Sequence, residues 1–213
     1  MSGTAASAGQ RADLVRNRRL LLGAATAAFA ERGVEVSMGE IAQRAGLAKG
    51  TVFRHFATKE DLLAAIMLRL LDRLTSTAER LLQAGDAGAA LREFMTSGVE
   101  ALAADRAFCE VVGRPSLQNP DVREAINHLC EVAEALTARA REHGAVRDDV
   151  TGTDIVLLLG GIHQTAAPLL AAQPQAWRRY LELALDGLHV PNAGALPEEA
   201  PRRLSLDGSP EAT

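Results

Sequence analysis

The sequence predicts an all-α protein with a small N-terminal domain and a larger helical body. Apolar residues recur three and four positions apart through most of the 213 residues, whereas no segment shows the period-two alternation of a strand. Gly and Pro residues divide the chain into segments of helix length. Near the N-terminus, two short amphipathic segments flank a glycine, which is the pattern of a helix–turn–helix.

The first helix of this helix–turn–helix pattern has strong start and stop signals. Ser37 is followed three residues later by Glu40, which predicts a capping box that satisfies two backbone N–H groups. Val36 and Ile41 have the spacing of a hydrophobic staple across the same helix start. Gly46 favours the left-handed conformation that ends a helix. We therefore expect a short helix that stops at a tight turn.

The second short helix, over residues 49–56, has an apolar side and a polar side. Val52 and Phe56 supply the apolar side, together with Leu47 just before the helix. The outward positions are Lys49, Gly50, Thr51, Phe53, Arg54 and His55. A cationic face that includes a glycine is typical of a helix that approaches phosphates and base edges closely. The sequence therefore indicates a DNA-recognition helix.

The distribution of charge supports DNA binding by the N-terminal part. Residues 1–60 contain nine Lys and Arg against five Asp and Glu, whereas residues 61–213 contain fourteen against twenty-two. The formal net charge is −4, which argues against a protein that coats nucleic acid indiscriminately. A basic domain on an acidic body favours docking on DNA at one place. A chance division of surface charge is the alternative explanation.

The N-terminal helix is predicted to run from Asp13 to Arg32, after a mobile arm over residues 1–12. Arg16, Arg18 and Arg19 lie near its start, where positive charge opposes the helix dipole. Contact with DNA phosphates explains such a cluster, and a solvated helix end is the alternative.

A long helix is predicted after the helix–turn–helix, and shorter ones follow it. Residues 58–61 cap the long helix, which runs to about Gln83. Further helical segments are expected at 88–104, 106–112, 119–143, 151–172 and 174–189. The composition after Pro191 turns to Pro, Gly, Glu and Ser, which predicts a disordered tail over residues 191–213.

From about Arg18 to Ile66 the chain resembles the TetR family of bacterial transcription regulators. The matching strings are LLGAATAAFAERG (21–33), SMGEIAQRAGLAKGTVFRHF (37–56) and KEDLL (59–63). The resemblance implies a DNA-binding domain over residues 13–60 and a helical effector-binding and dimerisation domain over residues 61–190. The C-terminal part is similar to SbtR-like regulators through LLLGGIHQTA (157–166) and AWRRYLELALDGL (176–188).

Two residues of the recognition helix depart from the family pattern. Ala48 stands where Ser or Thr usually caps the helix, and a missing cap typically costs about 1 kcal/mol. Phe53 stands where Tyr is usual, so a phosphate-directed hydroxyl is absent. The expected DNA-binding residues are Arg18, Ser37, Lys49, Gly50, Thr51, Phe53, Arg54, His55 and Lys59.

The two C-terminal helical segments are expected to form a homodimer interface. The segment from Asp154 to Leu170 is apolar over most of its circumference. The Gly160-Gly161 pair in its middle is unfavourable in an isolated helix, and close helix packing offsets that cost. The resemblance implies a four-helix interface between two copies, and packing within a monomer is the alternative. The expected interface residues are Leu158, Gly161, Thr165, Trp177, Tyr180, Leu181 and Leu185.

A small-molecule site is expected among the helices between about residues 62 and 165. The candidate lining residues are Met67, Phe94, Phe108, Cys109, His128, His163 and Gln164. Met and Phe at helical spacing are also ordinary core residues, whereas His163 and Gln164 are polar groups in an apolar helix and need partners. The aromatic content of 3% argues against an aromatic cage for a large planar ligand.

Other classes of protein find little support in the sequence. No nucleophile elbow, P-loop or H-E-x-x-H motif occurs, so we do not expect an enzyme. Two cysteines are too few for a C-x-x-C metal site, and no metal or cofactor is expected. No signal peptide or long apolar segment occurs, which predicts a cytoplasmic protein that does not enter a membrane.

The predicted function is that of a ligand-responsive transcription regulator. The resemblance implies a repressor that a small-molecule effector releases from a palindromic operator. A structural DNA-binding protein without a ligand is the alternative.

Overall fold

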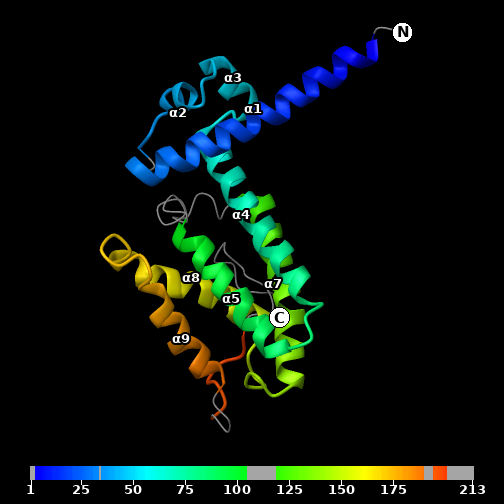
Figure 1. The fold of residues 1–213 in the computed structure, drawn as a ribbon, viewed down its shortest axis with the longest axis vertical. Coiled ribbons are helices and arrows are strands. Elements are labelled where there is room, and N and C mark those ends of the chain that lie inside the picture. The colour runs from blue at the N-terminus through cyan, green and yellow to red at the C-terminus, as the bar shows by residue number, and fades with distance from the viewer. Residues whose placement is uncertain (1–2, 34, 105–118, 190–193, 201–213) are drawn as a thin grey trace. The chain divides into compact units, whose positions relative to one another are not determined.

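The computed structural model describes residues 3–33, 35–104, 119–189 and 194–200, with side chains from residue 12 onward. These residues form eight α-helices and one short 3-10 helix, which confirms the predicted all-α fold (Figure 1). The helices are α1 Gly3–Arg32, α2 Met38–Arg44, α3 Lys49–His55, α4 Lys59–Leu81, α5 Ala87–Ala104, α7 Pro120–Glu142, α8 Gly152–Ala166, η2 Ala167–Leu169 and α9 Trp177–Leu188. Within the described residues, one compact unit ends at Met67 and a second begins at Leu68.

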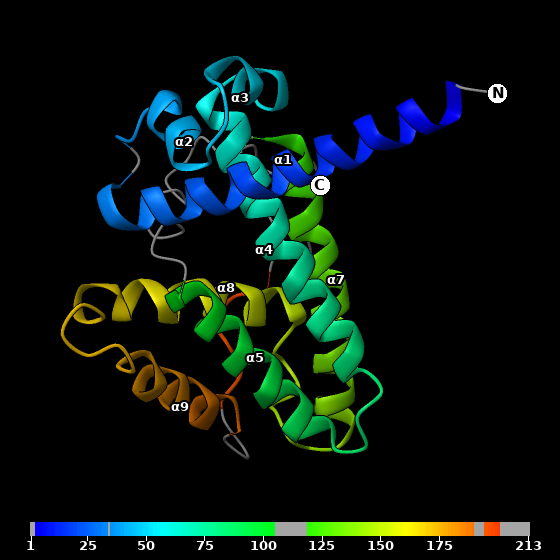
Figure 2. The same ribbon diagram turned by 45° about the horizontal axis from the view of Figure 1, so that its top comes forward.

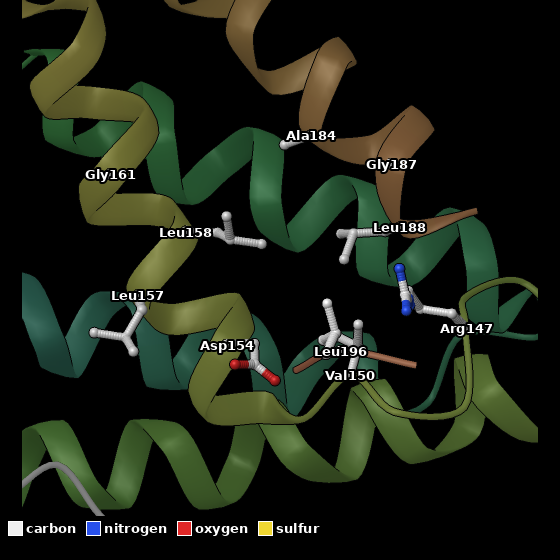
Figure 3. A pocket seen from close by; sticks show the side chains of 10 residues that line it. All are labelled: Arg147, Val150, Asp154, Leu157, Leu158, Gly161, Ala184, Gly187, Leu188 and Leu196. Atoms are coloured by element: carbon white, nitrogen blue, oxygen red, sulfur yellow. The ribbon is translucent and has the colours of Figure 1, made fainter. Parts of the chain in front are cut away.

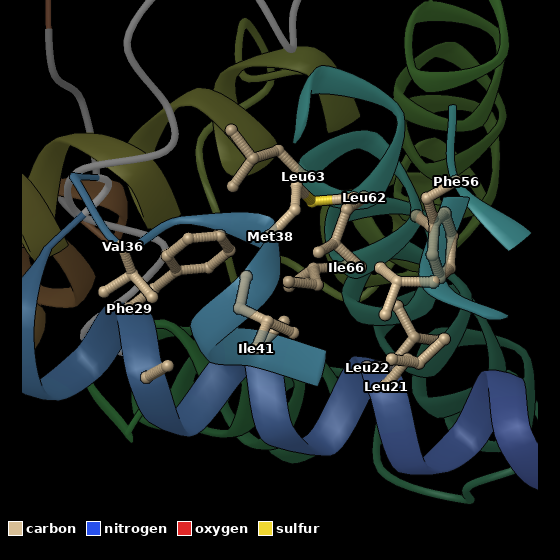
Figure 4. Close-up of a cluster of buried hydrophobic side chains, with 14 of the residues drawn as sticks. Leu21, Leu22, Phe29, Val36, Met38, Ile41, Phe56, Leu62, Leu63 and Ile66 are labelled. Carbon is tan, nitrogen blue, oxygen red and sulfur yellow. The ribbon is translucent and has the colours of Figure 1, made fainter. Parts of the chain in front are cut away.

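The first unit has an apolar core between α1, α2, α3 and the start of α4 (Figure 4). α2 packs against both α1 and α3. α1 supplies Leu21, Leu22 and Phe29, and the start of α4 supplies Leu62 and Ile66. Leu21, Ala25 and Phe29 are four positions apart on α1, as are Leu62 and Ile66 on α4, so each helix turns one face into the core.

Two ion pairs on the surface tie α2 to α1. Arg32 lies 2.7 Å from Glu40, and Arg44 forms a two-bonded pair with Glu31 at 2.6 Å. The Arg44 guanidinium holds the pKa of the Glu31 carboxyl below its usual value. All four side chains are largely exposed, so these pairs contribute to orientation more than to stability.

The structure corrects the predicted start of the first helix. α1 begins at Gly3, ten residues before the predicted start at Asp13. The sequence from residue 3 to 12 contains no proline and is rich in alanine, which favours helix, so nothing in it stops the helix from extending toward the N-terminus.

The second unit is built around α8, which packs against α5, α7 and α9 (Figure 2). α5 also packs against α7 and α9. Phe94, Leu129, Ile155, Trp177 and Leu181 come from these four helices and are among its fully buried side chains.

α7 and α8 approach each other closely at Gly152. A Cβ atom there would overlap the backbone nitrogen of Glu134, so only glycine fits without movement of the backbone. The Gly152 N–H donates a hydrogen bond of 2.5 Å to the Glu134 carboxylate, and Arg141 donates one of 2.6 Å to the same carboxylate. Glu134 therefore joins α7 to the start of α8.

The C-terminal helices are shorter than predicted. α8 ends at Ala166 and continues as the 3-10 helix η2, where Pro168 has no N–H group for the helix ladder. α9 begins at Trp177 rather than at 174. The predicted helix at 106–112 lies outside the described residues, as does most of the predicted tail.

Two negative results apply to the part of the chain that is described. None of its helices combines the length and the apolar character that crossing a membrane requires. It also brings no three His, Cys, Asp or Glu side chains together in a way that suits a metal ion.

Candidate nucleic-acid interface

The turn between α2 and α3 is set by Gly46, as the sequence predicts. Gly46 has a φ of 67°, in the left-handed region. The Leu47 N–H donates to the Ala42 carbonyl at 3.0 Å, and the Gly46 N–H donates to the Gln43 carbonyl at 3.1 Å. These two bonds form a Schellman motif, which satisfies the carbonyls at the end of α2 and turns the chain sharply into α3.

The start of α2 has the predicted capping box. The Glu40 N–H donates to Ser37 Oγ at 3.3 Å, and the Ser37 N–H donates to the Glu40 carboxylate at 2.8 Å. Bonds from Ser37 and Arg32 lower the pKa of Glu40 to about 2. The Ser37 hydroxyl also donates to Glu40 at 2.7 Å, so its proton is used within the cap. The phosphate contact expected of Ser37 stays a prediction.

α3 separates its residues into a buried and an exposed face, as predicted. Val52 is 0% exposed and Phe56 at the C-cap is 3% exposed, because both pack in the core of the first unit. The outer face carries Lys49, Gly50 and Arg54, which are exposed, and Phe53, whose exposed fraction is 45%. The face offers cations, an apolar ring and a position without a side chain, which are the groups that contact phosphate, sugar and base edges.

Two residues of the outer face form a pair. Arg54 donates a hydrogen bond of 3.2 Å to the hydroxyl of Thr51, one turn earlier. This bond restricts the rotamers of both side chains before any partner arrives, and restricted side chains lose less entropy on binding.

The start of α3 is uncapped, as the sequence predicts. Ala48 has extended backbone geometry and makes no side-chain hydrogen bond, and its carbonyl accepts from the Thr51 N–H at 2.8 Å. α4 differs, because Thr58 and Asp61 form a reciprocal cap at its start, with bonds of 2.9 and 3.1 Å. This cap fixes the first residue of α4, Lys59, which is half-buried.

Arg18 of α1 lies at the C-terminal end of α3. Its guanidinium carbon is 4.7 Å from the centre of the Phe56 ring, a cation–π contact between the two helices. Burial and the charges of Arg18 and Arg54 lower the pKa of neighbouring His55. The structure thus brings together three of the predicted DNA-binding residues, from two helices, in one cationic cluster.

The first unit thereby has the geometry of a helix–turn–helix DNA-binding protein. Residues 21–66 match the sequence model of the bacterial regulatory proteins of the tetR family, and residues 86–190 match that of the SbtR-like transcriptional regulator C-terminal domain. The chain belongs to the TetR family of DNA-binding transcription regulators and has an SbtR-like C-terminal domain. Members of this family regulate transcription and are not enzymes.

Solved and curated relatives support this membership. A TetR transcription regulatory protein from Mycobacterium vanbaalenii is 34% identical, with a TM-score of 0.60 over 85% of this chain and 99% of that one. The transcriptional repressor KstR2 of Rhodococcus jostii (strain RHA1) is 25% identical over 82% of this chain and 92% of its own length. The transcriptional activator FasR of Mycolicibacterium smegmatis is 37% identical over 35% of each chain.

The residues predicted to bind a small molecule fall into three groups. Met67, Phe94 and His163 are buried, and burial lowers the pKa of His163, which favours the neutral imidazole. His128 and Gln164 are exposed, and the His128 ring lies 3.7 Å from Glu131 one turn away. The structure does not enclose these two side chains, and their role in ligand binding stays a prediction. Phe108 and Cys109 lie outside the described residues.

The structure also sorts the residues predicted for the dimer interface. Trp177, Leu181 and Leu185 are buried inside the second unit of a single chain, and their place in a dimer interface stays a prediction. Leu158, Gly161, Thr165 and Tyr180 are exposed or half-buried on α8 and α9.

The sequence analysis missed two exposed leucines near this surface. Leu157 on α8 is 47% exposed and Leu183 on α9 is 57% exposed. Apolar residues surround most of α8 in sequence, so periodicity alone did not distinguish its inner from its outer face.

Proposed function

We propose that this protein is a homodimeric repressor that a small-molecule effector releases from a near-palindromic operator. The outer face of α3 carries the proposal, because the exposed Arg54 and the open Gly50 lie opposite the buried Val52. Lys49 is also exposed, at the start of the helix. A single recognition helix of this size has a small footprint, so two copies in successive major grooves supply the affinity. Because the two recognition helices of a symmetric dimer are related by a two-fold axis, the operator has two half-sites related in the same way.

The roles of the DNA-binding residues follow from their positions. Lys49, Thr51 and Arg54 lie on the outer face of α3 and read base edges, and Phe53 packs on a sugar or a thymine methyl. His55, Arg18 and Lys59 hold phosphates around the ends of α3 and at the start of α4, and Ser37 does so at the start of α2. Phosphates also complete the uncapped start of α3, because oxygen acceptors satisfy its first N–H groups.

The effector site belongs to the second unit. Phe94 on α5 and His163 on α8 are candidate lining residues, because these two helices pack together and both side chains are buried. A neutral imidazole among apolar groups suits a largely apolar effector with one hydrogen-bonding group. An effector changes the affinity for DNA only to the extent that its own affinity differs between the DNA-binding and the released conformations. α4 continues from the first unit into the second and transmits the change between them.

A gel-shift assay on the promoter fragments that flank the gene tests DNA binding and its release. We expect a discrete shift at nanomolar protein that survives an excess of unrelated DNA, and loss of that shift with a fraction of small cellular metabolites. Arg54→Ala should weaken the discrete shift and reduce its resistance to unrelated DNA, whereas Arg69→Ala, on the exposed side of α4, is the matched control. Retention of binding in every metabolite fraction would contradict effector release but not DNA binding.

Activation of transcription is the second candidate, since FasR is an activator and KstR2 a repressor. The match to KstR2 spans both units of the chain, whereas that to FasR covers about a third of it, which favours repression. Deletion of the gene separates the two. Transcripts from the bound promoter should rise in the deletion strain, and a fall would assign activation.

A further inference from the structure

The described part of the second unit contains an apolar hollow between α8 and α9, with a volume of about 440 Å³ (Figure 3). Leu158 and Gly161 of α8 lie on one side and Ala184 and Leu188 of α9 lie on the other. Arg147 and Val150 of the α7–α8 connection also line it, and so does Leu196, which lies after α9 and is 44% exposed. None of the residues predicted to bind the effector lines this hollow.

A clamp in the α7–α8 connection holds the segment that carries Leu196. Arg147 and Asp149 form a two-bonded ion pair with distances of 2.5 and 2.8 Å. Arg147 also donates to the Gly194 carbonyl at 2.6 Å, and the Leu196 N–H donates to the Asp149 carboxylate at 3.0 Å. Each of these last two bonds joins residues 47 positions apart in sequence, so together they anchor residues 194–196 against the body. This anchored segment, residues 194–196, is called the strap below.

The surface around the hollow is apolar and its charges are already paired. Leu157, Leu183 and Leu196 are the exposed leucines of α8, α9 and the strap. The carboxylate of Asp154, on the rim, bonds the Thr151 N–H at 2.8 Å and the Thr151 hydroxyl at 2.9 Å. Arg147 is satisfied by Asp149 and the strap. A partner covering the hollow therefore leaves neither of the two charged side chains that line it without a bond, and an unpaired buried charge is the main penalty for such burial.

A second copy of this chain fits the surface better than an unrelated partner. The α8, α9 and strap region carries both exposed leucines and a hollow of leucine size or larger, which are the two features that association of identical copies across a two-fold axis requires. The open Gly161 adds to this, because a Cβ atom there would meet nothing within 4 Å and another backbone can come close.

We propose that the strap is part of the surface through which two copies associate, and that the Arg147–Asp149 clamp positions Leu196 as the wall that receives an exposed leucine of the second copy. This inference rests on the homodimer of the proposed function, and it adds residues 194–196, which follow α9, to the dimer interface. The strap then sets how tightly the two copies pair, and through that pairing how tightly the operator is held.

Sedimentation equilibrium of the full-length protein tests the strap with two variants and a control. Leu196→Ser removes the apolar wall, and Asp149→Asn weakens the clamp without touching α8 or α9. Each should raise the dimer dissociation constant by about tenfold or more, because part of the interface is removed. Arg92→Gln is the control, since it breaks an exposed ion pair with Glu182 of α9 away from the hollow and should leave the constant within about twofold.

The outcomes distinguish the strap from the dimer itself. A wild-type protein that is monomeric at micromolar concentration refutes the dimer of the proposed function, and the strap proposal with it. A wild-type dimer whose dissociation constant is the same in Leu196→Ser and Asp149→Asn refutes the strap alone. Leu196→Ser that lowers the melting temperature but leaves the dimer constant unchanged also refutes it, because the leucine then only seals its own protomer.

Discussion

Arg54 is the side chain best placed to read sequence. It is exposed in the last turn of α3, and its bond to Thr51 holds it close to the helix. A guanidinium in a major groove commonly donates two bonds to a guanine edge, and such a pair discriminates against the wrong base by about 1–3 kcal/mol.

We therefore expect Arg54→Ala to relax the preference for particular base pairs of the operator. Binding to a set of single-base operator variants measures this loss position by position. Arg19→Ala, an exposed arginine on α1, should instead weaken all sequences alike. A uniform loss in Arg54→Ala as well would assign Arg54 to the backbone.

His55 should make operator binding depend on pH. In the free protein, burial and the charges of Arg18 and Arg54 hold its pKa below the usual 6.5. A DNA phosphate beside the ring favours the charged form and raises the pKa in the complex, so the complex binds more protons than the free protein. Operator affinity should therefore rise as the pH falls from about 8 to about 6.

Fluorescence anisotropy across this pH range measures the effect at constant ionic strength. His55→Gln should flatten the profile, whereas His143→Gln, an exposed histidine at the C-cap of α7, should preserve it. An unchanged profile in His55→Gln would place the titrating group elsewhere.

The two helices of the helix–turn–helix are stabilised to different degrees. α2 has a complete capping box and a Schellman end, whereas α3 starts at an uncapped Ala48. Because α3 has only seven residues, its order depends on packing of Val52 and Phe56 and on what satisfies its first N–H groups.

Substitution of the two cap positions should act in opposite directions. Ser37→Ala should lower the free energy of unfolding by about 1 kcal/mol, and Ala48→Ser should raise it by about 0.5–1 kcal/mol. Urea unfolding at neutral pH measures both, since the carboxylate of Glu40, with its pKa near 2, stays charged there. The Glu40 contribution is present above about pH 4.5 and is lost as the pH falls toward 2.

The junction of α7 and α8 depends on Gly152. A Cβ atom would overlap the Glu134 backbone, which belongs to a helix and has little room to move. Gly152→Ala should therefore destabilise the protein by about 1–3 kcal/mol, the range for overpacking. Gly160→Ala is the matched control, because a Cβ atom there meets nothing within 4 Å and alanine favours the helix. Equal stability of the two variants in thermal unfolding would contradict the close approach.

The full protein binds DNA as a dimer in our proposal, and its salt dependence reports this directly. A substitution that removes one phosphate interaction from each protomer removes two from the complex, and each contributes about 0.9 to the slope of log affinity against log salt. Lys59→Ala should therefore reduce the slope by about 1.8. A reduction of about 0.9 indicates one bound protomer, and an unchanged slope excludes a phosphate interaction of Lys59.

Much of the DNA-binding unit was predictable because its signals are local. The Ser37–Glu40 cap, the Gly46 turn and the uncapped start at Ala48 each involve residues no more than five positions apart, and the structure has all three. The contact of Arg18 with Phe56 was not predictable, because it joins residues 38 positions apart through the packing of α1 against the rest of the unit.

The second unit was less predictable from its sequence than the DNA-binding unit. The sequence analysis located its helices, but it did not show that Trp177 and Leu181 are buried within their own chain or that His128 is exposed. Apolar periodicity shows that a face is buried and not whether the same chain or another one buries it. Likewise, the strap lies in a segment whose composition predicted disorder, and it is held by Arg147 and Asp149 from far away in sequence.

By itself, the sequence determined the helical class, the helix–turn–helix and the cationic outer face of α3, because each depends on caps, glycine conformation and short-range spacing. Only the tertiary structure decided which leucines face outward, which predicted ligand residues are enclosed, and where the chain after α9 is anchored. Those properties depend on contacts between residues far apart in sequence, which are formed when the helices pack and leave no local pattern.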